Sequence, residues 1–314
     1  MSKSIKSGPS RPAVRLVTVD EAAEGQRVDN FLIRHLRGVP KSHIYRLLRS
    51  GQVRVNGGRI RAHYRLRPGD RLRVPPVRVA TQPLSHGPPP RLVDRLTAAI
   101  LQEDADFIVL DKPCGVAVHG GTGNPWGVIE TLRAAWPGSS RLTLAHRLDR
   151  DTSGCLVLAR RRRALLGFQD ALRAGTVTKE YLVLLHGRLE RRRRVEVPLV
   201  RQAGAMRAGV GGKPARTEFE IVQSLPDATL VRARLHTGRM HQIRVHAAHL
   251  GHPVLGDEKY GDFAANRAWR RRGLRRIFLH AARIAFRFEG RGVEAEASLP
   301  PELDAVLSQA QVAS

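Results

Sequence analysis

The residues with the clearest chemical potential lie in the segment 146–154, which leads into an apolar run. Two carboxylates, Asp149 and Asp151, stand two residues apart and are interspersed with Arg147 and Arg150. A carboxylate surrounded by arginines stays ionised at neutral pH and can act as a base or as a nucleophile. A charged turn between two strands is the simpler alternative, and it would be favoured if this segment stood alone. Three further polar segments favour the chemical interpretation.

The first of these segments is Lys112-Pro113-Cys114-Gly115, which ends a strand-like run and precedes the glycine-rich stretch 118–123. Its glycines match neither the dinucleotide-binding pattern nor the P-loop pattern, so a nucleotide-binding loop is not indicated. A tight turn that lets the backbone approach a substrate is the better interpretation.

The other two segments lie further along the chain. Tyr181 stands at the head of a strand in Lys179-Glu180-Tyr181, where a half-buried structural tyrosine is the ordinary alternative. The segment 237–246 is a dense polar cluster that shares a strand or a first helical turn with core residues. Within it, Arg244 and His246 alternate with the apolar Ile243 and Val245.

Two other chemistries are disfavoured by spacing. The histidines between positions 241 and 252 match no common zinc pattern and have no accompanying cysteine, so no metal site is expected. Ser153 lacks the glycine two residues earlier that marks the nucleophile of many hydrolases, so no serine hydrolase is predicted.

The charge of the chain indicates a polyanionic partner. Its 314 residues include 54 Lys and Arg against 28 Asp and Glu, a formal net charge of +26. An excess of this size attracts phosphate groups and makes nucleic acid the first candidate. General enrichment in arginine is the alternative explanation for the runs 160–163 and 191–194. The hydrophobic fraction of 42% is enough for a folded core, which excludes a disordered basic tail.

The cysteines and the hydropathy of the chain indicate in which cellular compartment the protein is expected. Cys114 and Cys155 both lie in apolar segments and are expected to be buried free thiols in a reducing compartment. The sequence has no run of 18 apolar residues and no hydrophobic leader. A soluble, cytoplasmic protein without membrane contact is therefore expected.

The elements that must position these residues fall into two expected domains. Residues 1–13 are predicted to be a disordered basic segment, and residues 14–75 a small helix–helix–hairpin domain that turns at Asn56-Gly57. Three basic residues are spaced along its second expected helix, and we predict that this face contacts phosphates rather than only solvent. These residues are Lys41, Arg46 and Arg49.

The larger domain is expected at residues 92–305, after a proline-rich linker at 76–91 and before a flexible tail at 306–314. Its strand-like and helix-like runs do not alternate regularly, which favours an α+β fold with a central mixed or antiparallel sheet over a doubly wound one. Strands are expected at 107–110, 155–159, 181–185 and 229–235, and helices at 128–135 and 164–174.

The segment 146–154 resembles the His-Arg-Leu-Asp-x-x-Thr-Ser-Gly signature of the RluA superfamily of pseudouridine synthases. Companion motifs occur in the same order, and residues 27–42 resemble the opening of an S4 RNA-binding domain. With the linker, the similarity covers about residues 14–305 and is closest to the RluC type, which modifies uridines of 23S rRNA. The companion motifs are Lys112-Pro113-x-Gly115, Lys179-x-Tyr181, the segment 237–246, Gly251-His252-Pro253, Gly256-Asp257-x-x-Tyr260-Gly261 and Leu279-His280-Ala281.

The resemblance implies a role for each candidate residue. Asp149 corresponds to the catalytic aspartate, and Arg244 to an arginine that pairs with it. Tyr181 corresponds to a tyrosine that stacks on the target base, with help in removing the C5 proton as a second implied role. Arg147 corresponds to an arginine that fills the gap left by the extruded nucleotide. Substrate or RNA contacts are expected of the remaining candidates, which are His146, Arg239, His241, Lys112, Lys41, Arg46 and Arg49.

The resemblance further implies a pseudouridine synthase fold and an isomerisation that needs no cofactor. The expected partner is 23S rRNA or a large-subunit precursor, with no membrane partner, and a monomer is expected. A sister enzyme acting on tRNA is one alternative. A ribosome-assembly factor that binds RNA without catalysis is another, although it would not require Asp149, Tyr181 and Arg244 together. Whether Asp149 attacks C1′ or removes the C2′ proton stays open at this point.

Overall fold

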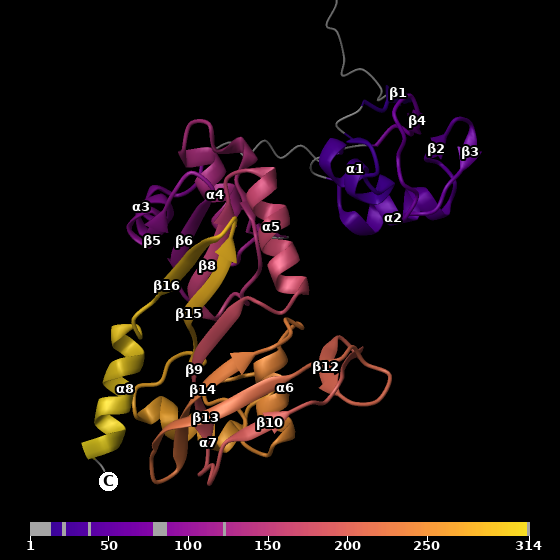
Figure 1. Ribbon diagram of the computed structural model, residues 1–314. Helices are drawn as coiled ribbons and strands as arrows, with labels where there is room; N and C mark the ends of the chain where they lie inside the picture. The colour runs from indigo at the N-terminus through magenta and orange to yellow at the C-terminus, as the bar shows by residue number, and fades with distance from the viewer. Residues whose placement is uncertain (1–13, 21–22, 37–38, 78–86, 122–123, 313–314) are drawn as a thin grey trace, which may run out of the picture. The chain divides into compact units, whose positions relative to one another are not determined.

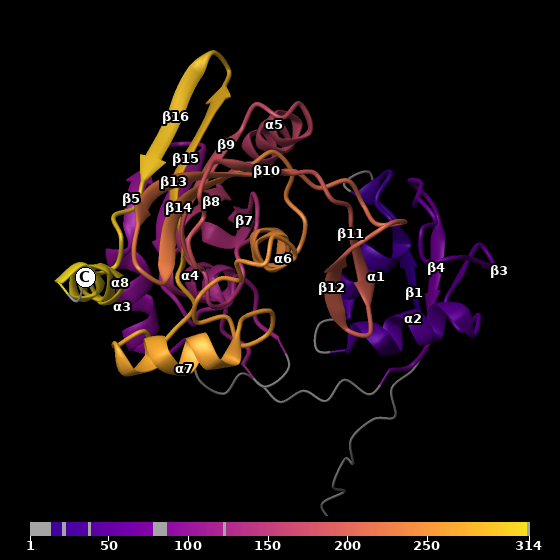
Figure 2. The same ribbon diagram turned by 90° about the horizontal axis from the view of Figure 1, so that it is seen from below.

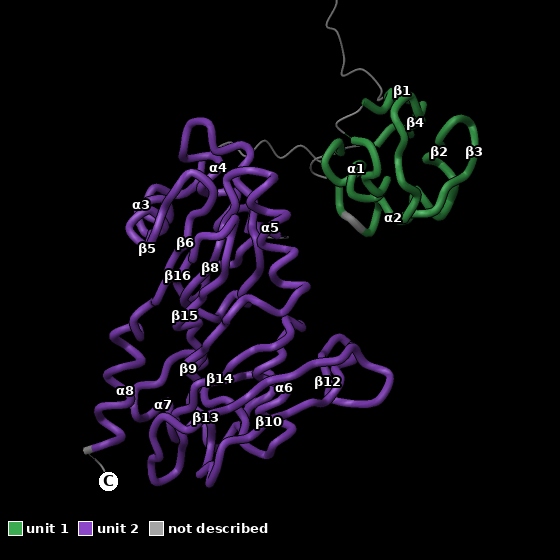
Figure 3. The backbone as a smooth tube through the Cα atoms, in the orientation of Figure 1, with its two compact units in different colours: residues 1–85 green, residues 86–314 purple. Residues whose placement is uncertain are grey.

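The computed structural model describes residues 14–20, 23–36, 39–77, 87–121 and 124–312. The chain divides into two compact units, residues 1–85 and residues 86–314, which are coloured separately in Figure 3. The predicted basic segment 1–13 and residues 78–86 of the predicted linker lie outside the described residues.

Unit 1 is an antiparallel four-stranded sheet with two helices, and its strands are ordered β1-β4-β2-β3 (Figure 1). Both expected helices are present, α1 at Val28–His35 and α2 at Lys41–Arg49. The strands are β1 at Arg15–Thr18, β2 at Arg54–Val55, β3 at Gly58–Arg59 and β4 at Arg71–Val74.

The amphipathic pattern explains this small fold. Phe31 and Ile44 of the two helices pack with Leu72 of β4 in one hydrophobic cluster. Asn56 and Gly57 have positive φ values of 50° and 81°, which is the turn geometry that an Asn-Gly hairpin favours. The polar side of α2 is left exposed.

One ten-stranded sheet organises unit 2 (Figures 1 and 2). Eight strands follow the order β10-β13-β14-β9-β15-β8-β6-β5, with β16 beside β15 and β7 beside β8. Neighbouring strands are antiparallel except β8 and β15, so the sheet is mixed, as expected. The strands are β5 at Ile100–Glu103, β6 at Phe107–Lys112, β7 at Thr143–Leu144, β8 at Ser153–Ala159, β9 at Thr178–His186, β10 at Arg193–Val195, β13 at Thr217–Ser224, β14 at Ala228–Leu235, β15 at Leu279–Phe288 and β16 at Arg291–Glu296.

Helices cover both faces of this sheet, which explains the continuous apolar runs of its central strands. On β6, Ile108 and Leu110 share a cluster with α4 (Val128–Ala135), whereas Phe107 and Val109 share another with α5 (Arg162–Arg173). The remaining elements are α3 at Pro90–Ala98, a 3₁₀ turn at Ser139–Arg141, the hairpin of β11 (Leu199–Gln202) and β12 (Ala205–Ala208), α6 at Gln242–His249 and α7 at Phe263–Arg271.

The C-terminal helix α8, Pro301–Val312, corrects one prediction. Leu303, Val306, Leu307 and Ala310 recur at helical spacing and are buried against Trp269 of α7. The tail predicted to be flexible from residue 306 is therefore helical as far as residue 312. The sequence interpretation missed this apolar stripe. No helix in the described part of the chain is both long and apolar enough to cross a membrane.

A close contact between β8 and β15 fixes the end of the loop that carries the Asp149 segment. Gly154 opens β8 with a φ of +107°, and a methyl group built on it would lie 2.2 Å from the carbonyl oxygen of Ala281. Only glycine fits this position, because a side chain would collide with the neighbouring backbone. The Thr-Ser-Gly sequence after Asp149 therefore serves to anchor the loop.

Candidate active site

The structure brings the three central candidates together around one cavity of about 290 Å³. Asp149 comes from the loop between β7 and β8, Tyr181 from β9, and Arg244 from the first turn of α6. Four of the other candidates line the same cavity: His146, Arg147, Arg239 and His241. The segments predicted to carry chemistry converge here, apart from the one that contains Lys112.

Asp149 faces two nitrogen donors. Its Oδ2 lies 3.4 Å from Nη1 of Arg244 and 3.7 Å from Nε2 of His241. The Asp149 side chain is 21% exposed, so a ligand in the cavity can reach it. The geometry presents an oriented carboxylate at the cavity wall.

The strongest partner of Arg244 is Asp257, to which the sequence interpretation gave no role. Nε and Nη2 of Arg244 donate to the two Asp257 oxygens at 2.7 and 2.8 Å, and Asp257 is 1% exposed. The backbone N–H groups of Lys259 and Tyr260 donate to the same carboxylate. Burial alone would raise the pKa of Asp257, but these hydrogen bonds hold it below its usual range. Asp257 thus fixes the guanidinium plane and leaves Nη1 for Asp149.

Tyr260 links Arg244 to His241. Its ring centroid lies 5.0 Å from the Arg244 guanidinium carbon, and its hydroxyl lies 2.8 Å from Nδ1 of His241. The hydroxyl accepts the N–H of Met206 and can donate its own proton to Nδ1. In that arrangement a neutral His241 carries its proton on Nε2, which faces Asp149. Burial lowers the pKa of His241, which is consistent with this neutral tautomer.

His241 is held in an unusual backbone conformation. Its φ of 55° places a non-glycine residue in the left-handed region immediately before α6. Hydrogen bonds of the Gln242 amide compensate for this strain. Its oxygen accepts from the Thr237 hydroxyl and the Arg239 N–H, and its NH₂ group donates to the Arg216 carbonyl and the Thr217 hydroxyl at the start of β13. The turn 237–241 is therefore rigidly attached to the sheet.

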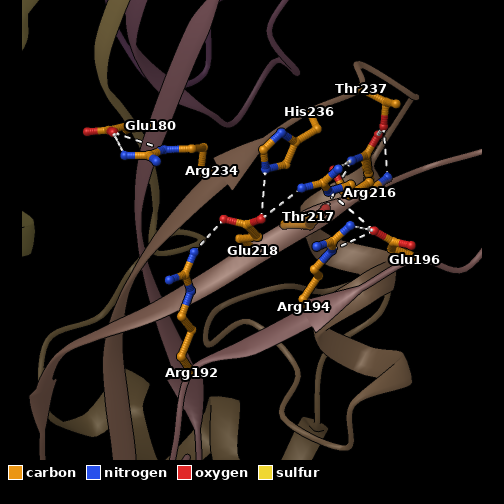
Figure 4. Close-up of polar contacts among 11 residues, drawn as sticks. Glu180, Arg192, Arg194, Glu196, Arg216, Thr217, Glu218, Arg234, His236 and Thr237 are labelled. Carbon is orange, nitrogen blue, oxygen red and sulfur yellow. Dashed lines mark hydrogen bonds and ion pairs between the residues drawn. The ribbon is translucent and has the colours of Figure 1, made fainter. Parts of the chain in front are cut away.

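A polar network on the strands behind this turn supports it (Figure 4). Glu218 of β13 accepts from Arg192 at 2.7 Å and from Arg216 at 3.1 Å, and it lies 3.2 Å from His236. The hydrogen bonds and charges of these partners lower the pKa of Glu218 to about 2. The Arg216 backbone N–H donates to Thr237, which connects the network to the turn at the cavity.

Tyr181 is 7% exposed and lines the cavity beside Asp149. Burial and the Asp149 charge raise the pKa of its hydroxyl above the usual value. The ring therefore carries a neutral phenol at physiological pH and offers a flat apolar surface with a protonated polar tip.

The side chains of His146 and Lys112 hydrogen-bond to the protein's own backbone, which the sequence interpretation did not predict. Nε2 of His146 accepts the Val157 N–H at 3.0 Å, and burial lowers its pKa to about 4, so it is a neutral wall residue. Lys112 is 0% exposed and donates to three carbonyls, those of Pro113, Val116 and Arg150. The expected RNA contact of Lys112 is therefore corrected: its ammonium ties the 113–116 loop to the residue after Asp149.

The remaining candidates are exposed basic residues. Arg147 and Arg239 stand on the cavity wall, and Nε of Arg239 donates to the Pro214 carbonyl. The Arg147 guanidinium makes no hydrogen bond or ion pair with any described residue. In unit 1, Arg46 and Arg49 are exposed on α2. Lys41 begins that helix, and its side chain is outside the described part of the structure.

A larger groove of about 1010 Å³ adjoins the cavity at Asp149, since Asp149 and Arg244 line both. Phe263 of α7, 67% exposed, lies on its wall. Several basic side chains line the groove: Arg150, Lys259, Arg267, Arg270 and Arg275. The cavity therefore opens into a groove that is lined by basic side chains and by one exposed aromatic ring.

Ser153 is unsuited to nucleophilic attack on a substrate, as expected. It is 2% exposed, and its hydroxyl lies between Nδ1 of His280 at 2.9 Å and Nη2 of Arg276 at 2.6 Å. Nε2 of His280 is hydrogen-bonded to the carbonyl oxygen of Ala297. Over the described ranges, no group of three or more potential metal ligands is close enough to hold an ion.

Comparisons with known proteins agree with this geometry. Residues 106–249 match the RNA pseudouridylate synthase family, and residues 26–72 match the S4 domain. The chain is 45% identical over 306 residues to ribosomal large subunit pseudouridine synthase C of Pasteurella multocida, covering 94% of this chain and 93% of the relative. It is 46% identical over 290 residues to the protein of the same name from Escherichia coli K12, covering 90% and 91%.

Two solved human structures share the fold. Human RNA pseudouridylate synthase domain containing 4 has a TM-score of 0.60 at 24% identity, over 70% of this chain and 96% of that one. Human RNA pseudouridylate synthase domain containing 1 has a TM-score of 0.57 at 29% identity, over 70% and 90%.

Proposed function

The chain belongs to the RNA pseudouridylate synthase family, and we propose that it converts uridines of 23S rRNA into pseudouridine with Asp149 as its catalytic carboxylate. The observation that carries the assignment of the residue is the convergence of Asp149, Tyr181 and Arg244 on one cavity. The relatives' names support the choice of large-subunit RNA, and the S4 domain supports an RNA substrate.

The reaction needs an ionised carboxylate at the ribose. Breaking the N1–C1′ bond is assisted if Asp149 attacks C1′ or removes the C2′ proton, and both routes require the oxygen to be held in place. Arg244 holds it, and the buried carboxylate of Asp257 holds Arg244. The Asp149 oxygen is therefore held in place by side chains of the protein itself.

The target uridine must leave its stack before the carboxylate can reach it, which costs a few kcal/mol. Tyr181 supplies an aromatic surface within the cavity for the extruded base. The unpartnered guanidinium of Arg147 is suited to occupy the space that the base leaves. Because the Tyr181 hydroxyl is protonated, its first role is to stack on the base.

Affinity for the RNA is expected to come mainly from phosphate contacts. The basic groove beside the catalytic cavity is suited to the strand on either side of the target. In unit 1, helix α2 begins at Lys41 and exposes Arg46 and Arg49 on one face. This face is suited to bind phosphates of a further stretch of the RNA. We expect a monomeric enzyme that acts on free 23S rRNA or on a precursor particle in the cytoplasm.

Tritium release from RNA labelled with [5-³H]uridine tests this proposal, because the C5 hydrogen is lost when the new C5–C1′ bond forms. We expect release from 23S rRNA or from large-subunit precursor particles, and none from bulk tRNA. Release from tRNA alone would reassign the substrate. No release from any of the three RNAs would contradict the proposed function.

A further inference from the structure

Lys179 is a largely buried cation that has no partner in the described part of the chain. It is 9% exposed, lies on β9 and lines the catalytic cavity. Its ammonium forms no hydrogen bond and no ion pair with any described residue, in contrast to Lys112, whose ammonium donates to three carbonyls. Burial lowers the pKa of Lys179, and no nearby carboxylate opposes that effect.

The Lys179 side chain is largely buried and its ammonium opens onto the cavity, so the loss of hydration is not offset by a hydrogen bond or a counter-charge from the described residues. The rest of the fold must offset the cost of such an unpaired ammonium. That cost is reduced when a bound ligand supplies the missing hydrogen-bond acceptor. The cavity into which Lys179 opens is the one that holds Asp149 and Tyr181. The missing acceptor is therefore expected on the substrate.

The position of Lys179 identifies which part of the substrate it meets. Lys179 and Tyr181 are two residues apart on one strand, so both side chains point to the same face of the sheet at a separation of about 6.5 to 7 Å. A methyl group built on Gly238 would lie 3.7 Å from Nζ, so the ammonium reaches toward the turn between β14 and α6. A base stacked on the Tyr181 ring would present its edge to this ammonium.

We propose that Lys179 is a further catalytic residue, which donates a hydrogen bond to a carbonyl oxygen of the target uracil and stabilises the negative charge that the base acquires when the N1–C1′ bond breaks. This inference rests on the proposed function. A phosphate is a poorer candidate for the acceptor, because Lys179 is more than nine-tenths buried whereas Arg147 and Arg239 are exposed on the cavity wall.

The step balances without any added reactant. When the N1–C1′ bond breaks, its electron pair stays on the base and spreads over N1, O2 and O4. C1′ is then bonded to Asp149, or Asp149 has taken the C2′ proton; either route leaves the same uracil anion. C5 next bonds to C1′; in the first route the bond between C1′ and the Asp149 oxygen breaks in this step and regenerates the carboxylate, and in the second route the C2′ proton returns from Asp149. The C5 proton is then lost to solvent, and N1 takes up a proton. Lys179 keeps its protons throughout.

The two basic groups that contact Asp149 are already engaged. Arg244 is held by Asp257 and contacts Asp149, and the neutral His241 is hydrogen-bonded to Tyr260. Arg147 also lacks a partner among the described residues, but it is exposed on the cavity wall. Lys179 is the largely buried cation, on the same strand as Tyr181, and it can respond to charge developing on the base. Such preorganised donors act in the transition state more than in the ground state.

The test compares Lys179→Met, which keeps the chain length and removes the charge, with wild type in single-turnover reactions on 23S rRNA. We expect the rate constant to fall by about 10²- to 10³-fold, as for the loss of one oxyanion-type donor. RNA affinity should stay within about threefold, since the lost contact strengthens only in the transition state. The melting temperature should be unchanged or higher, because an unpaired buried charge has been removed.

A second substrate separates catalysis from structural support. Fluorine at C5 makes uracil a better leaving group, so an anion-stabilising lysine matters less for 5-fluorouridine. We expect the fold-loss of Lys179→Met, measured as consumption of the nucleotide, to be at least about tenfold smaller on 5-fluorouridine RNA, since a factor of ten corresponds to one pKa unit of leaving-group stabilisation. An equal loss on both RNAs, or a melting temperature as low as that of the control Lys112→Met, would overturn the inference.

The outcomes also separate the two proposals. A wild-type enzyme without activity on 23S rRNA, precursor particles or tRNA overturns the proposed function and this inference with it. An active wild type beside an equally active Lys179→Met overturns the inference alone.

Discussion

Replacing Asp257 by asparagine removes the charge that holds Arg244, and its effect can be worked out from the structure. The Asp257 carboxylate accepts four hydrogen bonds, two from the Arg244 side chain at 2.7 and 2.8 Å and two from backbone N–H groups at 2.8 and 3.0 Å. An amide has one acceptor oxygen, and its NH₂ group must face a donor on the other side. The Arg244 guanidinium is then left partly buried without its counter-charge.

The expected cost in stability is large. Removing one member of a buried ion pair costs about 3 to 5 kcal/mol. For a unit of this size, about 1 kcal/mol corresponds to a shift of roughly 2 to 4 °C, so the melting temperature of Asp257→Asn should fall by roughly 6 to 20 °C. The rate of tritium release below that temperature should fall by about 10²-fold, because Arg244 no longer aims Asp149.

Glu258→Gln is the matched control, since it changes the next residue in the same way. The Glu258 side chain is 84% exposed and meets Arg270 at 3.4 Å, so its loss should leave the melting temperature and the rate nearly unchanged. Thermal unfolding followed by circular dichroism and single-turnover tritium release measure the two effects. If Asp257→Asn matched the control in both, the claim that Asp257 positions Arg244 would be refuted.

Three further predictions concern other parts of the molecule. Tyr181→Phe keeps the ring, so RNA affinity in a filter-binding assay should stay within about threefold of wild type, whereas Tyr181→Ala should lose about 1 to 3 kcal/mol of binding; equal losses would exclude stacking. Changing both Arg46 and Arg49 to Ala should lower the slope of log affinity against log salt for 23S rRNA by about 1.4 to 1.8, as expected for two lost phosphate contacts, and an unchanged slope would argue against that face of α2. The pKa of Glu218 is lowered to about 2 in the fold from 4.5, so its stabilising contribution is present at neutral pH and is lost as the pH falls through about 2. The difference in melting temperature between wild type and Glu218→Gln should accordingly be largest above about pH 5 and shrink toward pH 2, and a constant difference across that range would contradict the assignment.

The sequence predicted the parts of the site that depend on local pattern. The run at 155–159 reads as a buried strand and the run at 128–135 as a helix; the first lies within β8, which begins two residues earlier, and the second is α4. Asp149, Tyr181 and Arg244 could be named because each lies in a short motif of the resembled family. Their convergence on one cavity depends on strand order, which no local pattern encodes.

The roles that were missed depend on contacts between distant segments. Asp257 was visible as part of a motif, but its pairing with Arg244 arises only when the loop after α6 folds back on that helix. Lys112 was assigned to RNA because it lies in a motif of the resembled family; the carbonyls that its ammonium contacts come partly from Arg150, 38 residues away. The unpaired state of Lys179 is likewise invisible in the sequence, since it is defined by what surrounds the side chain.

The most direct measurement for the central claim compares Asp149→Asn with Asp151→Asn in single-turnover tritium release from 23S rRNA labelled with [5-³H]uridine. Asp151 is the matched control, because it lies two residues away, is 67% exposed at its side chain and does not line the catalytic cavity. We predict that Asp149→Asn releases no tritium while still binding the RNA, and that Asp151→Asn retains activity. Release by Asp149→Asn at a rate near that of wild type would contradict the account.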